Sequence, residues 1–543
     1  MTDIRELGTK IWAMANELRG TMDASEYKNY ILGFMFYRYL SEHQETYMVE
    51  NDYFSIDCGQ TANDAYCAAA PEGSEEEADF AEALTAELGY MILPQYTWES
   101  LIAAIDSGGI KPSTFQEAFD SFEHYAKRGS APTTKNGKET PKGDFRGVFA
   151  DMALSNSRLG KDAVTRAKSL IKTMELVDEI NYLDENGRDL LGAVYEYLIG
   201  QFAAKAGKKG GEFYTPHSVS QIIAGIVTQG RTAEHGTFRV LDPTCGSGSL
   251  LLTVRNALPG ATDTSNSVKF YGQELNTTTY NLARMNLMMH GVDFESMRIR
   301  NADTLSEDWP DGIDNEGYDQ PRSVDAVVAN PPYSAHWDNS ETRLRDKRFM
   351  DYGKLAPKTK ADYAFLLHGL YHLDSEGTMA IVMPHGVLFR GAAEAVIRKA
   401  LLDKNYLDAV IGLPANIFYG TTIPTVILVF KKNRSERSVL FIDASNEFDK
   451  GKNQNTLNES HIQKILDTYA ARENVEKYAH LASREEIVEN EYNLNIPRYV
   501  DTFEEEEAID LVSVLRSLEE DDRTIADLES KIKEQIRSLG VEF

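Results

Sequence analysis

The sequence predicts an α/β protein in which helices cover both faces of a mostly parallel sheet. Three features of the 543 residues support this prediction. The N-terminal part has helical periodicity, the middle part alternates short apolar runs with helical stretches, and the C-terminal end repeats apolar residues near heptad spacing. We therefore expect an α-helical N-terminal domain, an α/β domain and a helical C-terminal tail.

The N-terminal domain is expected to span residues 1–206. Apolar residues recur at three- and four-residue spacing from Ile4 to Tyr47, and the pattern returns from Asp189 to Ala204. The segment Asp57–Gly73 between them is acidic and alanine-rich, and we interpret it as a surface excursion. A glycine- and lysine-rich stretch beginning near Gly207 ends the helical texture, so we place the domain boundary there.

The middle domain, residues 207–501, contains short runs that are apolar on both faces. Such runs indicate buried parallel strands between helices. They begin at Phe238, Val268, Val324, Thr378, Leu407 and Thr425. In sheets of this kind the ligand lies at the carboxyl ends of the strands, so the residues that follow each run are the candidates for chemistry.

The tail, residues 502–543, has the pattern of a long amphipathic helix or helix pair. The apolar positions stand among acidic and basic residues and include Leu511, Leu515, Leu518, Ile525, Leu528, Ile532, Ile536 and Leu539. Two interpretations stay open: the stripe packs on its own domain, or it binds another subunit.

Composition and charge limit the possible functions. The chain is 42% hydrophobic and 26% charged, which is typical of globular domains, and no apolar run reaches the length of a membrane span. We therefore expect no membrane association and, because no secretory signal is present, a cytoplasmic protein. The formal net charge of −29 repels a phosphate backbone, so binding to DNA would require a basic partner or sharply segregated charge.

The first strand leads into the sequence DPTCGSGS, where we place the binding of a small molecule. Glycines allow a tight turn and a close approach of the backbone to a ligand, and the helix that follows offers N-terminal amides. No Gly-Lys-Ser/Thr or G-x-G-x-x-G pattern is present, which excludes a Walker loop and the dinucleotide fingerprint. The candidate residues are Asp242, Gly246, Ser247, Gly248 and Ser249. A plain glycine-serine loop is the alternative.

Two acidic residues extend this candidate site. Glu274 ends the second strand, where an acidic side chain holds the hydroxyls of a ribose in nucleotide-binding sheets. Asp303 follows the third strand and could accept a hydrogen bond from the exocyclic amine of an adenine. The alternatives are a solvated turn for Glu274 and a local turn cap for Asp303.

The run that begins at Val324 ends in the sequence NPPY, residues 330–333, and this motif is the candidate catalytic site. Two prolines stop the strand and make the backbone rigid. The side-chain oxygen of Asn330 and the carbonyl of Pro331 can accept hydrogen bonds from an amino group on a heteroaromatic base, which would raise the electron density on its nitrogen. Tyr333 can stack on a base that has been extracted from a duplex. A rigid structural turn at Pro331 and Pro332 is the alternative.

These motifs resemble the series found in adenine-N6 DNA methyltransferases. The stretches GEFYTP, DPTCGSG, GQELN, NADTL and NPPY occur in the order of that family and are similar in particular to the modification subunit of Type I restriction-modification systems. The resemblance covers nearly the whole chain. It implies a Rossmann-like methyltransferase domain that uses S-adenosyl-L-methionine to methylate the N6 amino group of adenine in double-stranded DNA.

The resemblance also implies site residues and partners. It places the motif Glu212, Phe213, Tyr214, Thr215, Pro216 and His217 around the methyl donor, together with the glycine turn, Glu274 and Asp303, and it gives Asn330, Pro331, Pro332 and Tyr333 to the adenine. The family implies a DNA specificity subunit that pairs with two modification subunits, and an ATP-dependent restriction subunit in the full complex. The variant TCGSGS leaves undecided which backbone amides contact the donor.

Three other functions stay open. A stand-alone methyltransferase would need a target-recognition region, and no long basic insert with interleaved aromatic residues is evident. A cytosine-N4 enzyme shares the acceptor chemistry but more often carries serine in place of Asn330, and a catalytically silent scaffold would not need Asn330 and Tyr333. We interpret Cys245 as a buried small residue and not as a nucleophile, and the cysteine and histidine spacings predict no metal site.

Overall fold

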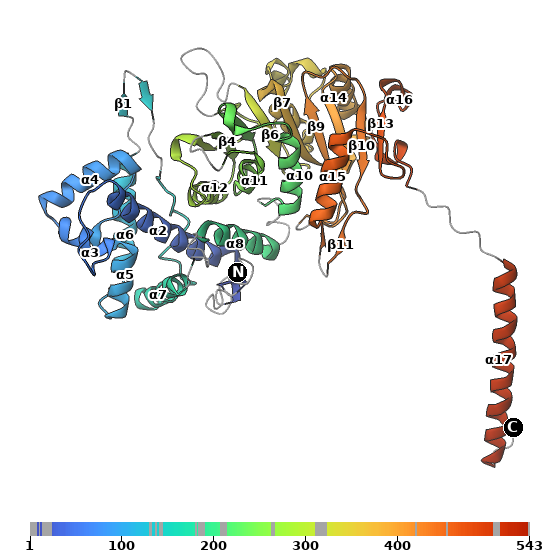
Figure 1. Ribbon diagram of the computed structural model, residues 1–543, viewed down its shortest axis with the longest axis horizontal. Helices are drawn as coiled ribbons and strands as arrows, with labels where there is room; N and C mark the ends of the chain where they lie inside the picture. The colour runs from blue at the N-terminus through green and yellow to red at the C-terminus, as the bar shows by residue number, and fades with distance from the viewer. Residues whose placement is uncertain are drawn as a thin grey trace. The chain divides into compact units, whose positions relative to one another are not determined.

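The computed structural model describes residues 8–9, 11–13, 24–129, 133–135, 138–140, 145–179, 182, 190–206, 214–261, 267–309, 323–418, 421–451, 454–502 and 511–540 (Figure 1). The chain divides into two compact units, Met1–Val500 and Asp501–Phe543.

The N-terminal part of the first unit is helical. Its helices are α2 (Ala24–Glu50), α3 (Ala62–Ala69), α4 (Glu75–Leu88), α5 (Trp98–Asp106), α6 (Thr114–Gly129), α7 (Ala163–Asp178) and α8 (Leu191–Ala206), with a hairpin of β1 (Thr133–Lys135) and β2 (Lys138–Thr140) after α6. Helix α2 carries aromatic side chains into the core, and the rings of Phe34 and Phe115 meet edge to face at 5.9 Å.

The interpretation of Asp57–Gly73 as a surface excursion was wrong in part. Helix α3 forms there, and Thr61 caps its first turn reciprocally with Asp64. Tyr66 on this helix is fully buried with Met48 and Leu84 in a small core of its own. The acidic, alanine-rich composition did not indicate a buried helix, because a single residue, Tyr66, supplies much of its buried area.

The expected sheet is present and mostly parallel. In the described residues it has nine strands in the order β13-β10-β8-β9-β7-β6-β3-β4-β5. The strands are β3 (Phe238–Asp242), β4 (Val268–Glu274), β5 (Met297–Asn301), β6 (Val324–Ala329), β7 (Leu373–Pro384), β8 (Leu407–Gly412), β9 (Thr425–Lys431), β10 (Val439–Asp443) and β13 (Ala479–Ala482). Strand β9 runs antiparallel to β7 and β8, β13 runs antiparallel to β10, and the other neighbours are parallel.

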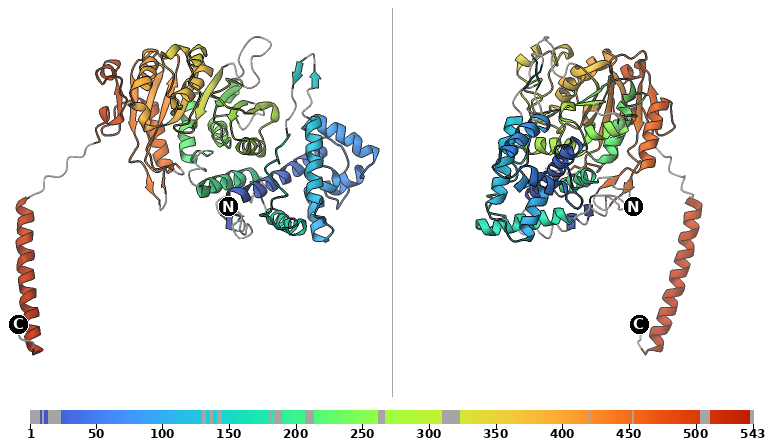
Figure 2. Two further views of the ribbon diagram at one scale, coloured as in Figure 1. Left: turned by 180° about the vertical axis from the view of Figure 1, so that it is seen from behind. Right: turned by 60° about the vertical axis from the view of Figure 1, so that its left-hand side comes forward.

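Helices cover both faces of the sheet, as predicted (Figures 1 and 2). One face packs against α10 (His217–Val227), α11 (Ser249–Ala257), α12 (Thr277–Met289) and α15 (Glu459–Ala471), and the other against α13 (Asp362–His372) and α14 (Ala392–Asp403). Successive residues of one strand enter opposite cores: Val240 belongs to the first and Leu241 to the second. This alternation explains why the strands read as continuous apolar runs.

The strand order brings the three motif-bearing strands together. Strand β3 lies between β4 and β6, with Asp242 opposite Gly272 and Leu241 opposite Val327. Because the three strands are parallel, their carboxyl ends meet at one edge of the sheet. The glycine turn, Glu274 and the NPPY motif therefore share that edge.

The N-terminal helices fasten onto helix α12, which follows Glu274. Asp151 accepts hydrogen bonds from the Thr278 hydroxyl at 2.6 Å and from the Asn281 amide at 3.0 Å. The Tyr39 hydroxyl donates to the carbonyl of Met288 at 2.8 Å. Helix α12, which follows Glu274, is thus held near both of its ends.

The first unit ends with α16 (Arg484–Glu489), and the second unit contains α17 (Leu511–Ser538). A further small hairpin pairs β11 (Asp449–Lys450) with β12 (Asn455–Thr456). No residue of α17 is buried, and Leu528 and Ile532 on its apolar stripe are 52% and 54% exposed. No helix in the described part of the chain is both long enough and apolar enough to cross a lipid bilayer.

Candidate active site

The turn after β3 forms the floor of the candidate site. Gly246 and Gly248 have φ angles of 55° and 76°, a left-handed conformation that residues with a Cβ rarely adopt. Gly248 is the N-cap of α11, so the turn leads directly into the helix N-terminus. The two glycines therefore allow the tight turn between β3 and α11, as the sequence predicted.

Asp242 lies at the base of this turn and is only 2% exposed. Its carboxylate accepts a hydrogen bond from the backbone N–H of Thr244 at 2.9 Å. Burial, assisted by the nearby charge of Glu274, raises the pKa of Asp242 to about 7. Within the described residues Asp242 forms no ion pair, so no cation offsets the cost of its burial.

Glu274 reaches the same turn from the tip of β4. Its carboxylate accepts hydrogen bonds from the backbone N–H groups of Gly246 at 3.1 Å and Asn276 at 2.8 Å. Burial raises the pKa of Glu274, while these backbone donors oppose the shift. The solvated-turn alternative does not describe this side chain, because it is partly buried and bonded to the glycine turn.

A small cavity opens above the turn. Its lining combines the glycine turn with residues of two other motifs: Tyr214, Thr215, Asp242, Thr244, Cys245, Gly246, Ser247, Ser249, Leu250 and Asn330.

Asn330 is held in one orientation at the wall of this cavity. Its side-chain amide donates to the Thr215 hydroxyl at 3.1 Å, and its Oδ1 accepts from the Tyr333 hydroxyl at 2.8 Å. The Tyr333 ring meets Phe418 edge to face, with centroids 6.3 Å apart. Burial raises the pKa of Tyr333 far above its usual value, so the phenol stays protonated and acts as a donor.

The structure brings most of the predicted site residues to this edge of the sheet. Tyr214 and Thr215 line the cavity, whereas Pro216 is the N-cap of α10 and His217 is its exposed first residue. Glu212 and Phe213 lie outside the described residues. Pro331 is buried and Pro332 exposed, and neither lines the cavity.

Asp303 lies apart from the cavity lining. It is exposed and accepts hydrogen bonds from the Leu305 backbone at 3.0 Å and the Ser306 hydroxyl at 2.5 Å. This is the turn-capping arrangement that the sequence left open as the alternative, and a contact with the donor stays a prediction.

Sequence reasoning missed three contributors to the site. Thr244 and Leu250 line the cavity but were not singled out within the quoted motif. Asn286 on α12 is fully buried and donates its amide hydrogen to the carbonyl of Ser247 at 3.0 Å, so it braces the glycine turn. The available signal was an asparagine among the apolar residues of the segment that follows Glu274.

Cys245 shows no sign of nucleophilic activation. The thiol is 5% exposed, and burial raises its pKa well above the usual value. A Cβ on the neighbouring strand at Gly272 would lie 3.0 Å from the sulfur, so the thiol fills a close contact between turn and sheet. The structure supports its interpretation as a small buried residue.

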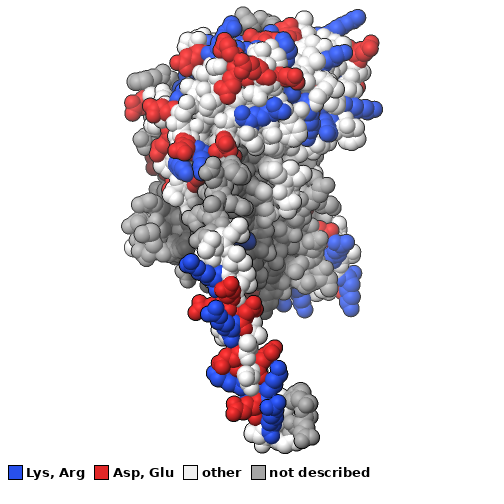
Figure 3. Space-filling model, turned by 90° about the vertical axis from the view of Figure 1, so that its right-hand side faces the viewer, with Lys and Arg blue, Asp and Glu red and all other residues white. Residues whose placement is uncertain are grey.

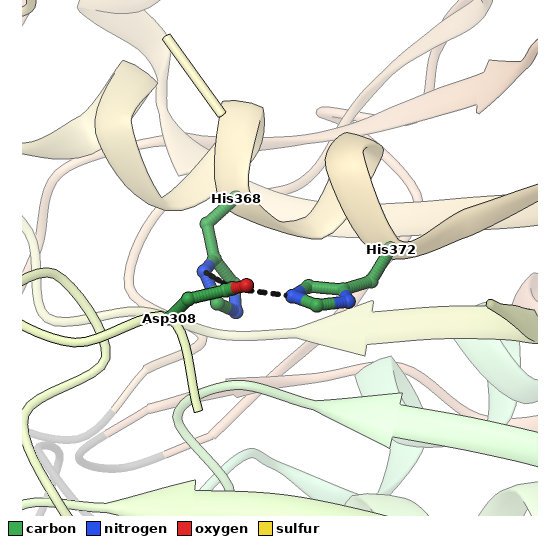
Figure 4. Close-up of side chains that lie close together, drawn as sticks. All are labelled: Asp308, His368 and His372. Carbon is green, nitrogen blue, oxygen red and sulfur yellow. Dashed lines mark hydrogen bonds and ion pairs between the residues drawn. The ribbon is translucent and has the colours of Figure 1, made fainter. Parts of the chain in front are cut away.

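A second polar cluster lies on the other side of the sheet (Figure 4). Potential metal-ligand atoms of Asp308, His368 and His372 all lie within 4.8 Å of one another, a grouping that the sequence did not predict. His372 Nε2 is 2.6 Å from the Asp308 carboxylate, and the Arg348 guanidinium is 3.1 Å from His368 Nδ1. Because a fixed positive charge opposes a metal cation, we interpret the cluster as a buried hydrogen-bond network.

The fold and this edge of the sheet define a class of protein. A glycine turn with two carboxylates suits a cationic nucleoside-type donor, and the Asn-Pro-Pro-Tyr motif beside it suits the amino group of a base. Together they are the parts of a methyltransferase that modifies amino groups of nucleic-acid bases.

Comparison with known proteins specifies this class. The N-6 DNA Methylase family model matches residues 186–508, and the HsdM N-terminal domain model matches residues 7–177. The chain belongs to the N-6 DNA methylase family, among the methylase subunits of Type I restriction enzymes.

Several relatives cover most of the chain. The MpnII methylase subunit of Mycoplasma pneumoniae is 37% identical over 98% of this chain and 96% of its own length. The HindI methylase subunit of Haemophilus influenzae is 32% identical over 65% of this chain and 79% of its own length. A crystal structure of a Type I methyltransferase subunit from Streptococcus thermophilus is 44% identical, with a TM-score of 0.80 over 92% of this chain and 100% of that one.

Proposed function

We propose that this chain methylates the N6 amino group of adenine in double-stranded DNA in the cavity between the glycine turn and Asn330. It is the modification subunit of a Type I restriction-modification system, and S-adenosyl-L-methionine is its methyl donor. The observation that carries the site assignment is the position of Asn330, which closes the same cavity that the glycine turn opens.

The charges of the cavity suit this donor. S-adenosyl-L-methionine carries a net positive charge, and Asp242 and Glu274 present two partly or fully buried carboxylates beside the turn. Within the described residues neither carboxylate forms an ion pair. When bound, the donor supplies an activated methyl group on its sulfonium; the glycine turn positions it, and Glu274 offers acceptors for the ribose hydroxyls.

Asn330 acts on the acceptor. Its Oδ1, together with the Pro331 carbonyl, accepts hydrogen bonds from the adenine amino group and raises the electron density on N6 as that nitrogen attacks the methyl carbon. With the donor bound, its sulfonium would supply the methyl group and keep the electron pair of the broken carbon–sulfur bond, and the methylated amino group would release one proton to water. Tyr333 stacks on the extruded adenine, and alignment of donor and acceptor provides most of the rate.

We further propose the assembly and the division of the chain. Residues 1–206 form the N-terminal helical domain, 207–501 the methyltransferase domain and 502–543 the assembly tail. A specificity subunit that binds two modification subunits selects the DNA site, and an ATP-dependent restriction subunit completes the complex, which acts in the cytoplasm. A silent scaffold and a cytosine-N4 enzyme are disfavoured by the intact asparagine at position 330.

The Asn330→Ala variant tests the catalytic assignment. In the complex with the specificity subunit, donor binding should stay within twofold while adenine methylation falls by orders of magnitude, because the lost hydrogen bond strengthens in the transition state. Single-turnover transfer of labelled methyl groups measures the rate. A normal rate in this variant would refute the mechanism.

The Glu274→Ala variant tests the donor assignment separately. It removes charge-assisted hydrogen bonds worth about 1.5–3 kcal/mol each, so donor affinity should fall at least about tenfold. Titration calorimetry on the purified chain measures it, with circular dichroism as the control for folding. Unchanged affinity in a folded variant would remove Glu274 from the site.

A further inference from the structure

The segment that follows the NPPY motif departs from the charge of the rest of the chain. The whole sequence has 85 acidic and 56 basic residues, yet residues 343–360 contain seven lysines and arginines and only two aspartates. We call residues 343–360 the basic loop. An acidic protein can bind a phosphate backbone only where its positive charges are concentrated locally, and the basic loop is such a concentration.

The C-terminal end of the basic loop lies beside the residues that directly follow the proposed catalytic motif. The Ser334 backbone N–H donates to the Asp362 carboxylate at 2.9 Å. This hydrogen bond joins the residue after Tyr333 to a residue just beyond the end of the basic loop. The Trp337 backbone N–H donates to the carbonyl of Lys358 at 3.0 Å, and Ala361 donates to Ala335 at 3.0 Å. The returning strand of the loop thus lies directly beside the residues that follow Tyr333.

The loop is anchored to the protein core at its centre. Arg348 is 2% exposed, pairs with Asp346 at 2.7 Å and donates to the carbonyl of Thr304 at 2.7 Å. The neighbouring Phe349 packs against Trp337, with ring centroids 5.3 Å apart. The exposed cations of the loop are therefore presented from a fixed support, which lowers the entropy lost on binding.

Four cations of the loop are available for a ligand. Arg345, Lys347, Lys354 and Lys358 are exposed, and none forms a salt bridge with another residue in the described ranges. By contrast, Arg343 faces Asp338 and Asp346. The available charges belong to the loop that borders the site where a base must enter.

We propose that the basic loop is a phosphate-binding surface that holds the DNA backbone next to the extruded adenine. This inference rests on the proposed function, because it requires DNA at the NPPY motif. Arg345, Lys347, Lys354 and Lys358 contact phosphates without reading sequence, which lets the specificity subunit choose the site. The contacts offset the repulsion from the carboxylates at the cavity and from the net charge of −29.

The test replaces these four residues with glutamine in the full-length chain, assembled with its specificity subunit. Binding of a mixed-sequence DNA duplex is measured by fluorescence anisotropy over a series of potassium chloride concentrations. Each phosphate contact contributes about 0.9 to the slope of log affinity against log salt, so the variant should lose about two to four from that slope. Donor affinity should not change.

A matched variant controls for total charge. Lys161, Lys168, Lys172 and Lys477 are exposed lysines away from the loop, and their replacement by glutamine removes the same four charges. The salt slope of this control should equal that of the wild type. Replacement of Lys347, Lys354 and Lys358 by arginine should also keep the wild-type slope, because a phosphate contact needs the charge.

Three results would overturn the inference. The first is an unchanged slope in the loop variant, and the second is an equal loss in the control. The third is weakened assembly of the loop variant with the specificity subunit together with a wild-type slope in the fraction that does assemble, which would make the loop a protein contact. Failure of the proposed function looks different, because the wild-type complex would then transfer no methyl group to adenine.

Discussion

At the scale of single residues, the site depends on how one amide is oriented. Asn330 must present its oxygen to the adenine, and its Nδ2 is occupied by the Thr215 hydroxyl at 3.1 Å. A rotated amide would place a donor where an acceptor is needed. We therefore expect Thr215 to link the GEFYTP motif to catalysis by fixing the orientation of Asn330.

Replacement of Thr215 tests this link. Thr215→Val removes the acceptor for the Asn330 amide with little change in volume, and we expect kcat for methylation to fall about tenfold, since a lost hydrogen bond costs about 1 kcal/mol or more. Thr215→Ser keeps the hydroxyl and should preserve most of the rate. Steady-state kinetics of both variants, with donor affinity measured in parallel, separates orientation of Asn330 from donor binding.

The Asp242 carboxyl predicts a pH dependence of stability. Its pKa is about 7 in the folded protein, against 3.8 when exposed, so the folded state binds the extra proton between these values. Stability therefore decreases as pH rises from about 4 to about 7, and the cost of the buried charge is fully present above pH 7.

Asp242→Asn removes this titration. The free energy of unfolding of the variant relative to the wild type should rise by a few kcal/mol between about pH 4 and pH 7, and its melting temperature should rise with it. Differential scanning calorimetry at several pH values measures it. A difference between the two proteins that is constant over this range would show that Asp242 is ionised throughout.

At the scale of elements, helix α12 supports the donor site. The N-terminal helices hold α12 through Asp151, and α12 holds the glycine turn through Asn286. The hydrogen bond from Asn286 is expected to hold Gly246 and Gly248 in their left-handed conformation before the donor binds. We therefore expect the N-terminal domain to support donor binding, although none of its described residues lines the cavity.

Asn286→Leu tests this support. The substitution removes the hydrogen bond to Ser247 at nearly constant volume, and donor affinity should fall about fivefold, as the loss of about 1 kcal/mol implies. Met289→Leu changes a buried residue at the end of the same helix and should leave affinity unchanged. Equal affinities for the two variants, both folded by circular dichroism, would show that the turn is stable without this brace.

At the scale of the whole molecule, helix α17 is a separate unit with an exposed apolar stripe. On the face that Figure 3 shows, basic and acidic side chains are interspersed along the helix. Such a surface suits a protein partner more than DNA, because nucleic-acid binding requires a basic face. We therefore favour the interpretation of α17 as an assembly helix.

Charged substitutions on the stripe test this interpretation. Leu528→Lys combined with Ile532→Lys would bury uncompensated charge in an interface at a cost of several kcal/mol, and co-purification with the specificity subunit should be lost. Donor binding and the melting temperature of the isolated chain should not change. Lys533→Gln alters the charged surface of the same helix and serves as the control. Normal co-purification of the double variant, with full methylation, would place the interface elsewhere.

Much of the fold and part of the site could be predicted because the information is local. Runs that are apolar on both faces identify buried strands, and the α/β fold class is confirmed. The residues that follow β3 and β6 could be recognised as candidate site residues. Glycines, prolines and an asparagine at strand ends have few structural reasons to occur together. The position of helix α3 was not predictable, because one buried tyrosine outweighs the composition around it.

The sequence by itself determined which residues form strands, where the glycine turn and NPPY lie along the chain, and which family they resemble. Only the tertiary structure decided that β3 lies between β4 and β6, that Thr215 orients Asn330, that Asn286 braces the turn, and that the basic loop returns to the catalytic motif. The physical reason is that these contacts join residues far apart in sequence. Local propensity fixes each element, whereas the packing of the two cores selects which elements meet.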